Sequence, residues 1–278
     1  MADSNSLTLT VLGSAGAYRT HDGSRASGYL VQHGATTLVL DLGHGTYAPL
    51  AAQIGINALP QISAVAISHL HPDHWVDLAA LRHALVHGNK MGADARSVAV
   101  ISPSGLAPRL ATLLNDQTPE EQAAGTRDSL QPFAFSTWRS DAALPPLGGG
   151  RVLPVGSLMV RSARVRHTGE SYALRVAARD QPGLTYSGDI SHWEDLAAIV
   201  QSGDTLLCEA AGGAAQWREG DTHVTAYGAG KAASSAGAAK LLLTHFGAEV
   251  DPAEAVRAAA TEFSGEIVAV LEGDRFEI

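Results

Sequence analysis

The apolar positions of the chain fall into short runs and into segments with helical spacing. Residues 7–12 alternate threonine with apolar side chains, which predicts a strand. Residues 29–31 and 37–40 predict two more strands, joined by a hairpin turn at His33-Gly34. Other apolar runs predict strands over residues 65–68, 98–101, 158–160, 172–176, 184–186, 205–208, 241–244 and 267–271.

The segments between these runs have the spacing and the end signals of helices. Ser191 paired with Glu194 predicts a capping box for one of them. Asp251 and Pro252 suit the N-cap and first position of the last one. Helices are thus predicted over residues 47–54, 73–87, 104–114, 191–200, 225–238 and 251–263.

The order of these elements predicts an α/β fold in a single domain over residues 1–278, because strands precede helices in each half and no linker divides the chain. Residues 115–150 are the least regular segment and are rich in proline and glycine. A long irregular segment of this kind is typical of a lid or binding loop. A plain surface excursion fits the same composition equally well.

Composition narrows the class of partner. Of the 278 residues, 45% are hydrophobic and 17% charged, which indicates a globular protein. The net charge is −9 and no basic stripe is visible. Because neutralisation of phosphates drives binding to long nucleic acids, we expect a small anionic substrate and not a nucleic-acid polymer.

Three observations bear on the cellular compartment that we expect for the protein. Cys208 is the single cysteine, which excludes an intrachain disulfide. The polar N-terminus lacks the pattern of a signal peptide. No apolar run approaches the roughly 20 residues that span a bilayer. We therefore expect a cytoplasmic protein without a membrane partner.

The segment His69-Leu70-His71-Pro72-Asp73-His74 places four metal-binding side chains within six residues, directly after an apolar run. Imidazole and carboxylate suit divalent zinc, manganese or iron. His167, Asp189 and His245 each lie at or just past a predicted strand, where loops bring side chains to one rim of a sheet. Together these residues predict a two-metal hydrolase.

These residues resemble the metallo-β-lactamase superfamily, whose fold is a four-layer αββα sandwich with a binuclear site between its sheets. The resemblance implies two divalent metal ions per chain, with zinc the first choice and manganese or iron as alternatives. It also implies that Asp41 orients a ligand from outside the metal sphere, and it suggests a homodimer. It assigns one ion to His69, His71 and His167, the other to Asp73, His74 and His245, and a bridging role to Asp189.

Two further motifs resemble the branch that contains ribonuclease Z and cyclic-nucleotide phosphodiesterases. They are Leu206-Leu207-Cys208-Glu209-Ala210 and His223-Val224-Thr225-Ala226. In that branch, Glu209 and His223 would supply a proton to the leaving group, while Asp73 would also accept a hydrogen bond from the attacking water. A plain salt bridge that holds a loop is the alternative for the first pair. Ser171 and Tyr172, which follow the third histidine motif, would contact substrate or only pack.

The resemblance therefore predicts hydrolysis of a small phosphodiester, with cyclic AMP as the best single substrate. β-Lactamases that use a thiol ligand have cysteine at the position of Asp189, which disfavours that activity. Ribonuclease Z carries a long arm that grips transfer RNA, whereas only a short hairpin separates His167 from Asp189. The alternatives are RNA 3′-end cleavage of the ribonuclease Z type, thioester or lactone hydrolysis, and a non-catalytic metal-binding sensor.

Overall fold

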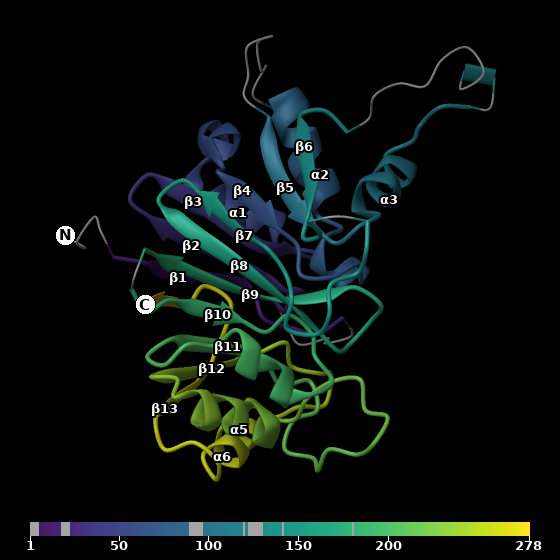
Figure 1. Ribbon diagram of the computed structural model, residues 1–278. Coiled ribbons are helices and arrows are strands. Elements are labelled where there is room, and N and C mark those ends of the chain that lie inside the picture. Colours follow the sequence, from purple (N-terminus) through teal and green to yellow (C-terminus); the bar gives the residue numbers. More distant parts are fainter. Residues whose placement is uncertain are drawn as a thin grey trace.

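Two mixed β-sheets form the centre of the molecule (Figure 1). The computed structural model describes residues 6–17, 23–88, 97–118, 120–121, 130–140, 142–179 and 181–278. Within these residues, the first sheet has the order β14-β1-β2-β3-β4-β5-β6. Its strands are β1 (Thr8–Gly13), β2 (Gly28–His33), β3 (Thr36–Leu42), β4 (Ala64–Ala66), β5 (Val98–Ser102), β6 (Phe133–Thr137) and β14 (Arg275–Glu277).

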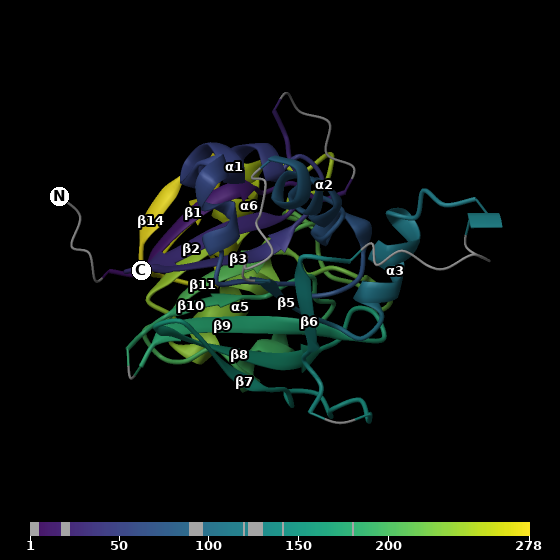
Figure 2. The same cartoon turned by 90° about the horizontal axis from the view of Figure 1, so that it is seen from above.

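The second sheet has the order β13-β12-β11-β10-β9-β8-β7. Each sheet has an antiparallel part and a parallel part. In the second sheet, β9 pairs antiparallel with β10, and the parallel part runs from β10 through β11 and β12 to β13. Figure 2 shows β9, β8 and β7 following one another toward the antiparallel edge. The strands are β7 (Val152–Val155), β8 (Leu158–Val165), β9 (Ser171–Ala178), β10 (Leu184–Tyr186), β11 (Thr205–Glu209), β12 (Lys240–Thr244) and β13 (Glu266–Ala269).

Alternation along the strands divides the buried side chains among three cores. Tyr29 and Val31 face the second sheet, while Leu30 between them faces the helices on the outside. The outer face of the first sheet packs against α1 (Tyr47–Ile54), α2 (Leu78–His83) and α3 (Leu106–Leu113), and that of the second against α5 (Ala226–Ala236), α6 (Pro252–Ala259) and the 3₁₀ helix η4 (Trp193–Ala198). The result is the predicted four-layer αββα sandwich (Figure 1).

The strands that the sequence analysis did not predict all lie at sheet edges. These are β14 and β6 in the first sheet and β7 in the second. An edge strand has one neighbour and often one exposed face, so its apolar pattern is weak, and Pro154 within β7 is tolerated there. The expectation that residues 115–150 are irregular is therefore wrong over β6. Part of residues 115–150 lies outside the described ranges, so a lid formed by this segment stays a prediction.

Two helix predictions need correction. Residues 73–87 do not form one helix: they comprise a 3₁₀ turn η2 (Pro72–His74), α2 and a π-helical turn η3 (Ala84–Gly88). Another 3₁₀ helix, η1 (Ile56–Gln61), follows α1. The predicted capping box is absent at η4, because the Ser191 hydroxyl donates to the carbonyl of Arg166 at 3.0 Å. That bond ties Ser191 to the segment before His167.

The remaining end signals and apolar runs are confirmed. Asp251 caps α6 by accepting from the backbone N–H of Ala253 at 2.8 Å. Cys208 is fully buried in β11. No helix within the described ranges combines the length and apolar character needed to cross a membrane.

A buried ion pair fixes the starts of β10 and β11. Asp204 is fully buried and accepts from Nε and Nη2 of Arg175, each at 2.8 Å. The hydroxyl of Thr185 and the backbone N–H groups of Gly183 and Gln201 also donate to it. Burial alone would raise the pKa of Asp204, but these hydrogen bonds, led by that of Arg175, hold the pKa below its ordinary value.

Replacing Asp204 by alanine should lower the free energy of unfolding at pH 7 by about 3–5 kcal/mol, because Arg175 would lose its partner in the interior. The difference should shrink as the pH falls below about 3.9, because the folded-state pKa is lowered and protonation cancels the contribution. Urea unfolding at several pH values measures both effects. Glu266→Ala, which breaks the exposed Lys240–Glu266 pair, is the control and should cost about 0–1 kcal/mol. Equal losses for the two variants would contradict the assignment.

Candidate metal centre

The segment after β4 supplies four side chains to the centre. The chain leaves β4 at Ala66 and turns through η2, which carries Asp73 and His74. His69, Asp73 and His74 are buried, whereas His71 is exposed. The short 3₁₀ turn thus brings buried polar groups to the end of an apolar strand.

The other side chains come from strand ends of the second sheet. His167 follows β8, Asp189 follows β10 and His245 follows β12. β10, β11 and β12 run parallel, so their carboxyl ends lie together on the same side of the sheet. This topology explains how residues far apart in sequence meet beside η2.

Asp189 is the point where the two halves of the centre join. Its Oδ2 lies 3.7 Å from Nε2 of both His69 and His167 and 3.3 Å from Nε2 of His245. Its Oδ1 lies 3.3 Å from Nε2 of His74. The potential ligand atoms form three groups, each within 4.8 Å: His69, His71, His167 and Asp189; Asp73, His74 and His245; and Asp189, His223 and His245. The structure therefore brings together all seven residues that the sequence analysis selected.

Among the described residues, three buried atoms at the centre make no hydrogen bond: Nε2 of His69, Nε2 of His74 and Oδ1 of Asp189. Leaving a buried polar atom unpaired costs about 1–3 kcal/mol. A divalent cation can satisfy two imidazole nitrogens and a carboxylate oxygen together. The donor set therefore fits metal binding.

The second nitrogen of most of these imidazoles is held by the protein, which turns Nε2 toward the centre. The Nδ1 partners are Ser68 Oγ for His69 at 3.1 Å, Asp41 Oδ2 for His74 at 2.7 Å, the Thr222 carbonyl for His167 at 2.8 Å and Ser27 Oγ for His245 at 2.9 Å. His71 differs, because its Nδ1 lies toward the centre, 3.2 Å from Nε2 of His167.

Asp41 supports both halves of the centre. It is fully buried and accepts from the Ser68 N–H and hydroxyl and from Nδ1 of His74, each at 2.7 Å, and from the Tyr186 hydroxyl at 2.8 Å. Through Ser68 it also reaches His69. Its φ of 53° lies in the left-handed region, which aspartate tolerates better than most residues. Residues such as Ser27, Tyr186 and Thr222 carried no sequence signal for these supporting roles.

Electrostatics favour the protonation states that metals bind at two of these groups. Burial would raise the pKa of Asp189, but His245, His74 and His69 hold it well below the ordinary range. Burial, reinforced by the charge of His74, lowers the pKa of His69. At His74 burial is outweighed by Asp189 and Asp41, which raise its pKa, so a cation must displace a proton there.

Glu209 and His223 form a pair beside the centre. Both carboxylate oxygens of the buried Glu209 lie 3.0 Å from Nδ1 of His223. The same Nδ1 lies 3.9 Å from Oδ2 of Asp189. Burial opposes protonation of His223, but the hydrogen bond to Glu209 raises its pKa to about 9. His223 lines a cavity of about 670 Å³ together with His71, Asp73, Asp189 and His245.

Ser171 and Tyr172 do not line this cavity among the described residues. Both are buried. The Ser171 hydroxyl bonds with that of Thr168 at 2.7 Å, and the Tyr172 hydroxyl donates to Glu170 at 3.1 Å. These contacts agree with the packing alternative for the two residues.

The chain is similar to one known protein family and to several known proteins. A family model described as a beta-lactamase superfamily domain matches residues 36–246. An uncharacterized protein of Mycobacterium leprae is 31% identical over 97% of this chain and 88% of its own length. A ribonuclease Z of Mycobacterium bovis is 28% identical over 98% of both chains. The crystal structure of the metallo-beta-lactamase fold protein YhfI from Bacillus subtilis covers 98% of this chain and 100% of its own, with a TM-score of 0.79 and 23% identity.

Asp41→Asn should weaken metal binding by about 10–100-fold, because the amide cannot supply the charge that holds the His74 and Ser68 hydrogen bonds. Competition with a chelator, followed by elemental analysis of the protein, measures the change. Asp77→Asn is the matched control, since the Asp77 carboxylate accepts from the Tyr47 N–H at 2.9 Å and belongs to none of the candidate metal groups. Unchanged affinity in Asp41→Asn would show that Asp41 does not act on the centre.

Proposed function

The chain belongs to the beta-lactamase superfamily of metallo-hydrolases, and we propose that within it this protein is a binuclear metal-dependent phosphodiesterase for small substrates. One cation would be held by His69, His71 and His167 and the other by Asp73, His74 and His245, with Asp189 shared between them. The two oxygens of Asp189 face different histidines, which supports the shared role. Zinc is the first choice of metal, and manganese and iron suit the same nitrogen and oxygen donors.

When bound, two such cations neutralise the phosphodiester anion and lower the pKa of a bound water. Asp73 lines the cavity with one oxygen 3.5 Å from Nε2 of His74. From that position its carboxylate can accept a hydrogen bond from the attacking water and orient it toward phosphorus.

The Glu209–His223 pair is the observation that carries the proposal. The carboxylate of Glu209 accepts a hydrogen bond from Nδ1 of His223, so Nε2 is the ring nitrogen that remains to donate a proton in the cavity. With its pKa raised to about 9, His223 carries a proton at neutral pH and can donate it. An alkoxide leaving group is a strong base, so its departure from phosphorus benefits from such a donor.

Several features favour a small substrate, with a cyclic nucleotide such as cyclic AMP as the best single choice. The net charge of −9 opposes binding of a long polyanion. β9 and β10 form an antiparallel pair joined by residues 179–183 alone, where the ribonuclease Z resemblance would place an arm. RNA 3′-end cleavage is the second candidate, because the Mycobacterium bovis ribonuclease Z matches nearly the whole chain.

His223→Ala should leave metal content unchanged and slow hydrolysis of esters with alkyl leaving groups by about 10²–10⁴-fold. Nitrophenyl esters should slow far less, because nitrophenolate leaves without a proton. Glu209→Gln should show the same selectivity, since it disturbs the orientation of the same imidazole. Equal slowing of both ester classes by His223→Ala would rule out the proton-donor role.

A direct comparison of substrates separates the candidate functions. The metal-loaded protein should hydrolyse cyclic AMP faster than it cleaves a precursor transfer RNA, with kcat/KM as the measure for each. Faster cleavage of the RNA would favour the ribonuclease Z alternative. Thioesters and lactones in the same panel test carboxyl-ester hydrolysis, and a fully loaded protein inactive on all of them would indicate a binding or sensor protein.

A further inference from the structure

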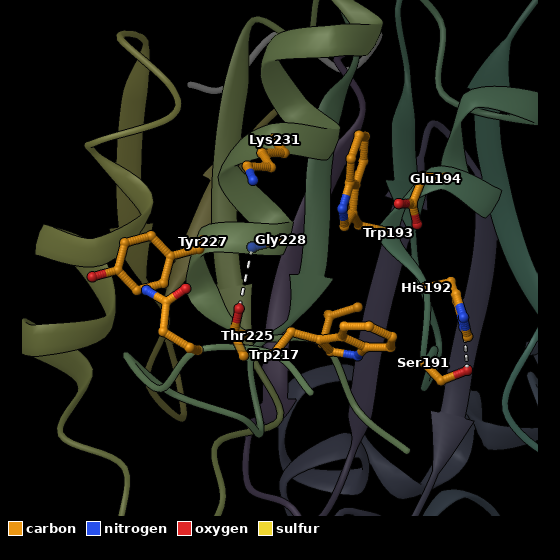
Figure 3. Close-up of a pocket in the computed structure, with 11 residues that line it drawn as sticks. Ser191, His192, Trp193, Glu194, Trp217, Thr225, Tyr227, Gly228 and Lys231 are labelled. Atoms are coloured by element: carbon orange, nitrogen blue, oxygen red, sulfur yellow. Dashed lines mark hydrogen bonds between the residues drawn. The ribbon is translucent and has the colours of Figure 1, made fainter. Parts of the chain in front are cut away.

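A second cavity, of about 230 Å³, lies between η4 and the start of α5 (Figure 3). Its walls come from η4 and the residues just before it, from the loop between β11 and α5, and from the first turns of α5. Aromatic rings and charged groups dominate the lining: His192, Trp193, Glu194, Trp217, Tyr227 and Lys231. In Figure 3, Trp217 lies on one side of this group, and Trp193 and Lys231 lie on the other.

Glu209 fixes this cavity relative to the proposed proton donor. Besides His223, Glu209 accepts from the backbone N–H of Ile190 at 2.7 Å. One wall of the cavity begins at Ser191, directly after Ile190, and another begins at Val224, directly after His223. The same carboxylate therefore positions both walls and the imidazole. His223, the proposed proton donor, directly precedes the wall that begins at Val224.

The lining has the chemistry that recognises a flat heteroaromatic ring. Trp217 is 41% exposed, although tryptophan usually buries most of its surface, and its ring contacts that of His192 at a centroid distance of 5.3 Å. Exposed indole rings are platforms on which nucleobases stack. Glu194 can only accept hydrogen bonds when ionised and Lys231 can only donate them, so the lining offers both kinds of hydrogen-bond partner that a base needs.

The size of the cavity limits the ligand to a single ring system. Cavities for drug-sized ligands measure about 300–1,000 Å³, and this one falls below that range. The phosphodiester itself would lie in the cavity at the metal centre, which Asp189 and His223 line. Residues that line the two cavities are neighbours in the sequence: Asp189 and Ser191 in one segment, and His223 and Val224 in the other.

We propose that this second cavity is a nucleobase subsite, which binds the base carried by the leaving-group side of the substrate and thereby makes the enzyme selective for nucleotides. The placement on the leaving-group side rests on the function proposed above. The binding of a base does not, because a nucleoside without phosphate would suffice to occupy the cavity.

Equilibrium dialysis of the metal-loaded protein with adenosine, guanosine, cytidine and uridine tests the subsite without any hydrolysis. We expect the nucleosides to bind and free ribose not to bind. Trp217→Leu should weaken nucleoside binding by about 5–150-fold, the range found when a stacking partner of a base is removed. Trp217→Phe, which keeps a ring, should retain most of the affinity. The control is Leu113→Ala, which removes an apolar side chain that is 52% exposed on α3.

Kinetic measurements provide a second test of the subsite. Trp217→Leu should raise KM for a cyclic nucleotide by a similar factor with little change in kcat, and it should leave turnover of methyl nitrophenyl phosphate, which has no base, within about twofold of wild type. Nucleosides that fail to bind, or that bind equally well to Trp217→Leu and to wild type, would overturn the subsite. Nucleoside binding that depends on Trp217 in a protein inactive on every phosphodiester would support the subsite while refuting the proposed function.

Discussion

The centre depends on keeping one carboxylate ionised in the interior of the protein. Asp189 is buried just past the end of β10, where burial alone would favour its neutral form. The surrounding imidazoles reverse that preference, and they are in turn oriented by Asp41, Ser27, Ser68 and the Thr222 carbonyl. Each of these supports is itself buried or held by the backbone of a strand end or loop. Within the described ranges, the unpaired buried atoms of this network are the three that a cation would satisfy.

The sequence was sufficient for the fold class and for the convergence of the metal-binding residues, for a physical reason. Central strands such as β11 and β12 are buried on both faces, so they appear in the sequence as continuous apolar runs. The residues just beyond them must lie where the strands end. The edge strands β6, β7 and β14 lack that constraint and were missed. The helix predicted over 73–87 failed because its first residues belong to the centre and adopt a 3₁₀ turn.

Supporting residues were harder to predict than ligands. Ser27 lies 218 positions from His245, and nothing in its local sequence indicates the hydrogen bond between them. Asp41 was selected only through the family resemblance, and its contact with Tyr186 depends on how the two sheets pack. Local patterns indicate which residue types can bind a metal, whereas the packing of the sheets decides which neighbours orient them.

Hydrogen bonds across the two sheets have a consequence for how the protein folds. Tyr186 of the second sheet donates to Asp41 of the first, and Tyr29 of the first sheet bonds with Thr244 of the second at 2.7 Å. Neither half can orient the full set of imidazoles before the sheets dock. During refolding, tight uptake of cations should therefore mark the docking of the two halves, and an early intermediate in which only one half is ordered should have no high-affinity site.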